Sequence, residues 1–141
     1  MKWVYDDGGA SSYFSGPNYD CVVRSIAIAT NRDYKEILDL VNDYIKREPL
    51  DEKYVRNARL GVTKEITSKI LKDMGYKWIP TMKFAKGCKV HMRADELPGG
   101  TIIVSLSKHL SCIKDKVIYD VFDPSREGTR CVYGYWVIKE S

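Results

Sequence analysis

The central segment of this chain is Gly16-Pro17-Asn18-Tyr19-Asp20-Cys21-Val22-Val23-Arg24-Ser25-Ile26-Ala27-Ile28-Ala29. Its first five residues favour a loop, and the apolar run that follows predicts a helix over residues 21–30. Apolar side chains almost surround the axis of this helix, so we expect it to be buried at the centre of the fold. Asp20 is its candidate N-cap, which makes Cys21 the first helical residue.

The position of Cys21 favours a reactive thiol. The first N–H groups of a helix lack partners within the helix and carry a partial positive charge, which stabilises a thiolate. Thiolate chemistry also needs a base, and the chain has two histidines, His91 and His109. His91 lies in a segment typical of a strand edge, whereas His109 begins a strand-like segment that leads to Asp123. We therefore expect Cys21 to be the nucleophile, His109 the acid–base and Asp123 the orienting acid.

The rest of the chain predicts helices first and strands second. Helical spacing continues over residues 34–45, and again from the candidate N-cap Thr63 to Gly75, where we expect a left-handed helix end. Strands are expected at 77–81, 101–107, 109–114, 117–122 and 131–138, whereas residues 1–20 are expected to form an arm or loop and 46–60 an exposed connection. This order predicts a single α+β domain over residues 1–141, with the helices packed on a C-terminal antiparallel sheet.

The turn at Asp115-Lys116 leaves the choice of carboxylate open. A two-residue turn places Asp120 diagonally from His109 on the same face of the sheet. A three-residue turn shifts the register by one residue and places Asp123 on that face instead. Asp120 is therefore the alternative orienting acid.

Composition limits the classes of partner. The chain has 141 residues and a formal net charge of +4 without a basic cluster, so we expect no nucleic-acid partner. It has no long apolar segment and no signal-peptide core, so we expect a cytoplasmic protein that binds no membrane and has reduced cysteines. The four cysteines lack metal-binding spacing, so no metal or other cofactor is expected, and Cys88, Cys112 and Cys131 are interpreted as packing residues on strands.

The order Cys21, His109 and Asp123-Pro124 resembles the papain-like cysteine peptidase superfamily, especially the small bacterial peptidases that trim leader peptides. In that superfamily the cysteine starts the central helix, the histidine starts a strand, and the aspartate precedes a proline after the next strand. The resemblance implies a papain-like fold and a thiol-dependent hydrolase, such as a peptidase, an isopeptidase or a related acyl-transfer enzyme, with a peptide or protein substrate. The chain also resembles small phage and prophage proteins of unassigned function, through Asp20-Cys21, residues 87–91 and residues 129–136.

One feature of the papain-like pattern is missing. The superfamily usually has a glutamine several residues before the cysteine as an oxyanion donor, and residues 15–20 contain none. Asn18 has the same amide chemistry, and the backbone N–H of Cys21 is a second candidate donor. The alternative function is a weakly active or inactive accessory or inhibitor protein that binds a host protein through the same cleft.

Overall fold

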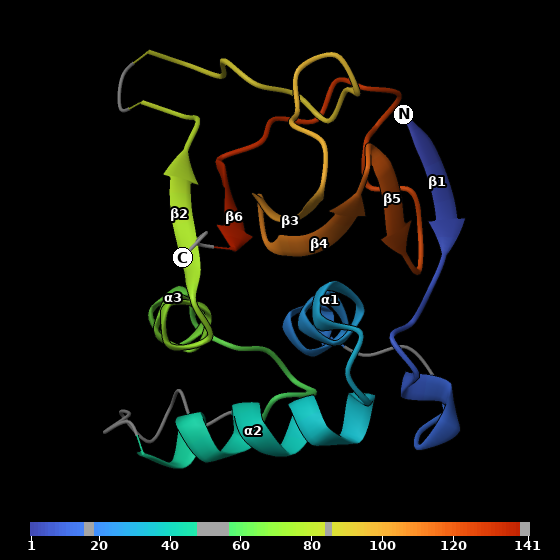
Figure 1. Ribbon diagram of the computed structural model, residues 1–141, viewed down its shortest axis with the longest axis vertical. Helices are drawn as coiled ribbons and strands as arrows, with labels where there is room; N and C mark the ends of the chain where they lie inside the picture. The colour runs from blue at the N-terminus through green and yellow to red at the C-terminus, as the bar shows by residue number, and fades with distance from the viewer. Residues whose placement is uncertain (16–18, 48–56, 84–85, 139–141) are drawn as a thin grey trace.

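The computed structural model describes residues 1–15, 19–47, 57–83 and 86–138, and over these residues the fold is α+β (Figure 1). Three α-helices are present in the described residues: α1 (Cys21–Thr30), α2 (Tyr34–Arg47) and α3 (Lys64–Asp73). A short 3₁₀ helix, η1 (Ala10–Ser12), precedes them. The strands are β1 (Lys2–Tyr5), β2 (Tyr76–Pro80), β3 (Thr101–Leu106), β4 (His109–Lys114), β5 (Val117–Asp120) and β6 (Gly134–Ile138). Within the same residues, no helix combines the length and apolar character needed to cross a membrane.

The sheet is mixed, which corrects the expectation of an antiparallel sheet. Its strand order is β1-β5-β4-β3-β6-β2, and β1 pairs with β5 in parallel while the other neighbours are antiparallel. The interpretation of residues 1–20 as an arm or loop was therefore wrong for β1. This strand has only four residues, all of them exposed, so it offers no alternation of buried and exposed positions from which to predict it.

The helix boundaries follow local signals. The structure confirms the helix over residues 21–30 and the helix that follows Thr63. The Thr63 hydroxyl accepts a hydrogen bond from the Ile66 N–H at 3.2 Å, and Gly75 has a φ of 92°, a left-handed conformation that glycine adopts without strain. The connection expected over residues 46–60 falls mostly on residues 48–56, which lie outside the described residues.

The helices lie on one side of the sheet, with α1 and α3 between the sheet and α2 in Figure 1. Helix α1 packs on β3, β4 and β5, and its Ile26 is fully buried in the same core as Ile103 of β3. Ile102 and Val104, which alternate with Ile103 along β3, belong to a second core. Each such side chain stabilises the fold by about 1.5–3 kcal/mol. The first core joins α1 to β4, where it includes Leu110, and these are the elements that carry Cys21 and His109.

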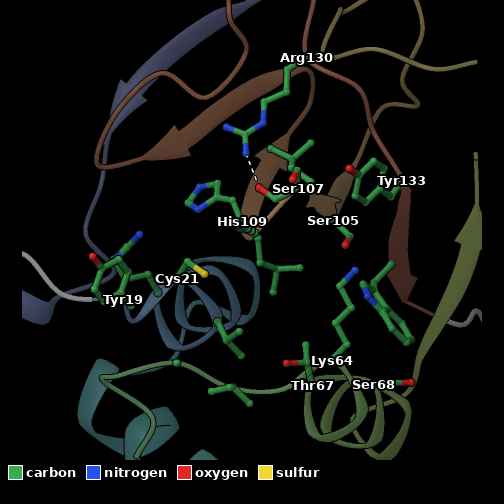
Figure 2. A pocket seen from close by; sticks show the side chains of 18 of the residues that line it. Tyr19, Cys21, Lys64, Thr67, Ser68, Ser105, Ser107, His109, Arg130 and Tyr133 are labelled. Carbon is green, nitrogen blue, oxygen red and sulfur yellow. Dashed lines mark hydrogen bonds between the residues drawn. The ribbon is translucent and has the colours of Figure 1, made fainter. Parts of the chain in front are cut away.

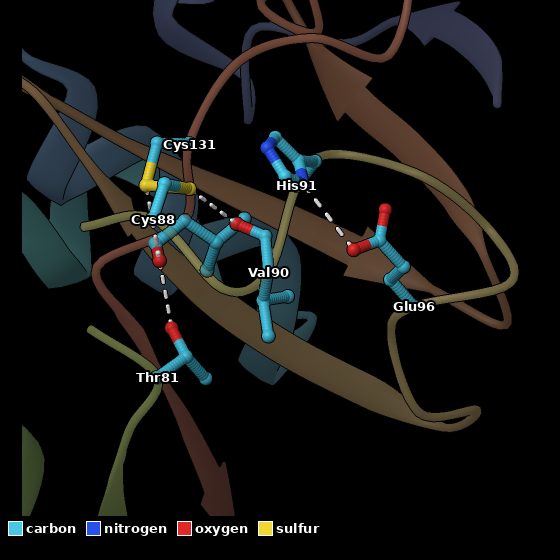
Figure 3. Close-up of a disulfide and its surroundings, with 7 residues drawn as sticks. Thr81, Cys88, Val90, His91, Glu96 and Cys131 are labelled. Atoms are coloured by element: carbon cyan, nitrogen blue, oxygen red, sulfur yellow. Dashed lines mark hydrogen bonds and ion pairs between the residues drawn. A yellow bond between two sulfur atoms is a disulfide. The ribbon is translucent and has the colours of Figure 1, made fainter. Parts of the chain in front are cut away.

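Cys88 and Cys131 form a disulfide, which corrects two expectations: that the four cysteines are reduced, and that Cys88 and Cys131 are packing residues on strands (Figure 3). Both residues lie outside the named strands, and their Cα atoms are 5.9 Å apart. An isolated antiparallel bridge between His91 and Cys131 aligns the two segments. Because 43 residues separate the two cysteines in sequence, no local spacing predicts this pair.

Candidate functional site

Helix α1 begins at Cys21, as the sequence predicts, and the Cys21 thiol faces a cleft next to His109 (Figure 2). The thiol is half-buried. No side chain caps the helix, because the carboxylate of Asp20 does not bond to the first-turn N–H groups. Asp20 therefore occupies the N-cap position that the sequence predicts, without a side-chain capping hydrogen bond.

Asp20 instead forms a buried polar cluster behind the site. One carboxylate oxygen is paired with the Arg24 guanidinium, and the other accepts a hydrogen bond from the Tyr34 hydroxyl at 2.5 Å. The Arg59 guanidinium lies 3.9 Å from the second oxygen. Because two guanidinium groups neutralise Asp20, its charge does not oppose a thiolate at the neighbouring Cys21.

The carboxylate that contacts His109 is Asp120, not Asp123. Nε2 of His109 lies 2.7 Å from Oδ2 of Asp120, and the Ser111 hydroxyl donates a second hydrogen bond to the same oxygen at 2.7 Å. The Asp120 side chain is only 3% exposed. Since Nε2 is engaged by Asp120, Nδ1 is the nitrogen that remains for the thiol.

The register of β4 and β5 explains why Asp120, and not Asp123, contacts His109. Lys114 pairs with Val117, so the β4–β5 turn has the two residues Asp115 and Lys116, both with positive φ. This is the arrangement that places Asp120 diagonally from His109 on one face of the sheet. Asp123, three residues beyond the end of β5, accepts a hydrogen bond from the Ser125 N–H at 3.0 Å and so stabilises a local turn.

The His109 imidazole is protonated at neutral pH because its pKa is raised. Burial alone would lower the pKa of its imidazole, but hydrogen bonds to Asp120 and Cys21, together with the negative charges of these two groups, raise the pKa to about 9. A protonated imidazole between a carboxylate and a sulfur atom is the arrangement that supports a thiolate–imidazolium pair.

Arg24 connects helix α1 to Asp120, a role that is not predicted from the sequence. It pairs with Asp20 on one side and lies 3.8 Å from Asp120 Oδ1 on the other. The Ser25 hydroxyl adds a hydrogen bond to the Leu110 carbonyl of β4 at 2.9 Å. These contacts fix α1 relative to β4 and β5. The sequence feature that could have indicated this role is the presence of a charged residue, Arg24, within an apolar helix.

The cleft beside the thiol has a volume of about 1030 Å³. Apolar side chains from the helices, the sheet and the segments beside them form much of its wall, among them Val22, Val62, Trp78, Leu106, Leu110, Val121, Phe122 and Trp136. This volume is at the upper end of the range for small-molecule sites, about 300–1,000 Å³, and is large enough for several residues of an extended chain.

Other residues considered from the sequence do not join this group. Asn18 lies outside the described residues. His91 does not line the cleft, and its Nδ1 lies 3.2 Å from the Glu96 carboxylate. Cys112 is a fully buried free thiol whose pKa is raised to about 12 by burial. The described residues contain no cluster of three metal-ligating side chains.

Comparison of this chain with models of known families, with curated proteins and with solved structures found no match. We therefore infer a function from the geometry and chemistry of the site.

Proposed function

We propose that this protein is a thiol-dependent hydrolase, a peptidase, isopeptidase or related acyl-transfer enzyme, in which Cys21 is the nucleophile, His109 the acid–base and Asp120 the orienting acid. The observation that carries the proposal is the position of the His109 imidazole, which hydrogen-bonds a buried carboxylate and lines the same cleft as the Cys21 thiol. Such a nucleophile–base–acid arrangement at the wall of a large cleft is the geometry required for covalent acyl transfer.

The residues supply each step of the reaction. The Cys21 sulfur attacks the carbonyl carbon of the substrate, and the carbonyl electrons move to oxygen to form a tetrahedral oxyanion. His109 then donates the Nδ1 proton to the leaving amine as the C–N bond breaks, which leaves a thioester on Cys21. A water molecule attacks the thioester while His109 accepts its proton, and the acid product and the thiolate separate.

Asp120 acts through His109. Its hydrogen bond to Nε2 fixes the tautomer and the direction of the ring, and its charge stabilises the imidazolium. The start of α1 supports the oxyanion, because the Cys21 N–H belongs to the uncapped first turn of the helix. Asn18 stays the proposed side-chain donor.

Selective alkylation tests the proposal. We expect iodoacetamide at mildly acidic pH to modify Cys21 and to leave the buried Cys112 unmodified, with the two thiols distinguished by peptide mass spectrometry. Cys21 is also the more accessible thiol, so the deciding comparison is between the wild type and His109→Gln. The variant should slow modification of Cys21 by about tenfold or more if the imidazole stabilises the thiolate.

An unchanged rate in His109→Gln would contradict the activated thiol. His91→Gln is the matched control, since His91 pairs with Glu96 outside the cleft and its loss should leave the rate unchanged. The hydrolase itself is tested by incubating a peptide library with the wild type and with Cys21→Ala. Cleavage that persists in Cys21→Ala would rule out Cys21 as the nucleophile. If an activated Cys21 is found without cleavage, and Cys21→Ala retains the biological effect, the accessory-protein alternative is favoured.

A further inference from the structure

The charged side chains of the cleft are all basic. Among the described residues that line it, Lys64, Lys108, Arg126 and Arg130 carry positive charge, as do Arg24 and a protonated His109, and none is acidic. A net charge of only +4 over the whole chain makes this concentration unusual, because acidic and basic residues are otherwise nearly balanced. The positive charge is therefore a property of the cleft, and it does not extend over the whole surface.

The charged side chains nearest the nucleophile all have partners of opposite charge. Asp20 is neutralised by Arg24 and Arg59, and Asp120 by His109 and Arg24. By contrast, Lys64, Lys108, Arg126 and Arg130 form no ion pair within the described part of the chain. These four residues, which we call the basic rim, hold the uncompensated charge of the cleft.

Among the four residues of the basic rim, Arg130 most clearly has a positive charge without a partner of opposite charge. It extends into the cleft from the segment before β6, and its guanidinium donates one hydrogen bond to the Ser107 carbonyl at 2.6 Å (Figure 2). Its Nε atom is buried without a hydrogen-bond partner. Burial and the nearby charge of Arg126 lower the pKa of the Arg130 guanidinium, so a bound anion would relieve the repulsion between the two guanidinium groups.

We infer that the substrate of this cleft is an acidic polypeptide segment, with carboxylate side chains that bind the basic rim beside the bond attacked by Cys21. This inference rests on the proposed function, since it names the substrate class of that site. Guanidinium groups bind carboxylates with paired, planar hydrogen bonds, which suits Arg126 and Arg130 to aspartate or glutamate. The apolar wall provides contacts for the rest of an extended chain.

The two tryptophans of the cleft give no support to a nucleic-acid ligand. Single-stranded nucleic acids bind basic grooves through bases that stack on exposed aromatic rings. Trp136 is only 5% exposed, and the Trp78 ring packs against it with the centroids 5.0 Å apart. Both indoles are therefore parts of the wall, and neither is a free stacking platform.

Peptide binding to the 141-residue chain with Cys21→Ala tests the inference without turnover. The probes are two rhodamine-labelled peptides, identical except that the glutamates of one are glutamines in the other. By fluorescence anisotropy at low salt, we expect the glutamate peptide to bind about tenfold more tightly, with a preference that falls as salt is added. Equal affinity for the two peptides would overturn the inference.

Charge-matched variants locate the binding. Arg126→Gln in the Cys21→Ala background should weaken binding of the glutamate peptide about threefold or more and leave the glutamine peptide unaffected. Arg32→Gln removes the same charge from a residue that does not line the cleft, and it should change neither affinity. If Arg126→Gln and Arg32→Gln have equal effects, the rim is not the binding site. An oligothymidylate of similar charge that binds as tightly as the glutamate peptide would also overturn the inference, in favour of a nucleic acid.

The peptide-binding experiment and the test of the proposed function can fail independently of each other. Preferential binding of the glutamate peptide by a protein whose Cys21 is not activated supports the acidic ligand and contradicts the hydrolase. Selective modification of Cys21, together with equal binding of both peptides, supports the hydrolase and overturns the acidic substrate.

Discussion

Nε2 of His109 lies 2.7 Å from Oδ2 of Asp120, and this carboxylate is buried together with Ser111, which bonds to the same oxygen. The pair belongs to adjacent strands of one sheet, so its geometry is set by backbone pairing and does not depend on a loop. A base held in this way stays oriented toward the start of α1 without reorganisation during the reaction.

Replacement of Asp120 tests the assignment of the acid. We expect Asp120→Asn to lower the pKa of His109 from about 9 toward its ordinary value, because a hydrogen bond to the carboxylate and its negative charge are lost. Cleavage of any peptide substrate should fall by about a hundredfold or more. NMR titration of the imidazole measures the first effect, with His91 as the reference. Asp123→Asn is the matched control, and a larger effect of that variant would restore Asp123 as the orienting acid.

Stability should depend on pH through His109. Its pKa is 6.5 ordinarily and about 9 in the folded protein, so the folded state binds this proton more tightly than the unfolded state. The resulting stabilisation, at most about 3 kcal/mol, is fully present below pH 6.5 and is lost as the pH rises through about 9. Urea unfolding of the wild type and His109→Gln over this range isolates the contribution. If the difference in unfolding free energy between the two proteins does not shrink with rising pH, this contribution of His109 is contradicted.

The Cys88–Cys131 disulfide predicts how many free thiols the protein has. Titration with a thiol reagent in denaturant should find two free thiols, Cys21 and Cys112, and four only after reduction. Because the bond closes a long loop, the double variant Cys88→Ser/Cys131→Ser should lose about 4 kcal/mol of unfolding free energy. Four free thiols in unreduced protein would contradict the bond. Such a bond persists mainly in oxidising compartments, so the count also tests the expectation of a cytoplasmic protein.

Gly134 is predicted to tolerate no side chain. A Cβ atom at this position would lie 2.3 Å from the Trp78 ring and 2.9 Å from the Ile79 carbonyl, so β2 and β6 would have to separate at the wall of the cleft. We expect Gly134→Ala to lower the free energy of unfolding by about 1–3 kcal/mol. The control is Gly99→Ala, where a Cβ atom would meet nothing within 4 Å. Thermal melts compare the two, and equal midpoints would contradict the close packing.

The sequence predicted the elements that depend on local chemistry. The helix that starts at Cys21, the N-cap at Thr63 and the left-handed Gly75 follow from apolar spacing and from short-range backbone preferences. The strand that starts at His109 follows for the same reason. The sequence therefore identified the thiol, the base and the two carboxylates from which the acid had to be chosen.

Contacts between distant segments could not be predicted in this way. The two-residue turn at Asp115-Lys116, and with it the choice of Asp120, depended on register, since a shift of one residue exchanges the faces of a strand. The pairing of β1 with β5 and the Cys88–Cys131 bond join segments that carry no local signal for each other. The basic rim likewise combines α3, the β3–β4 turn and the segment before β6. A linear pattern specifies which groups exist and the local conformation of each, whereas the folded chain sets the distances and charges between them.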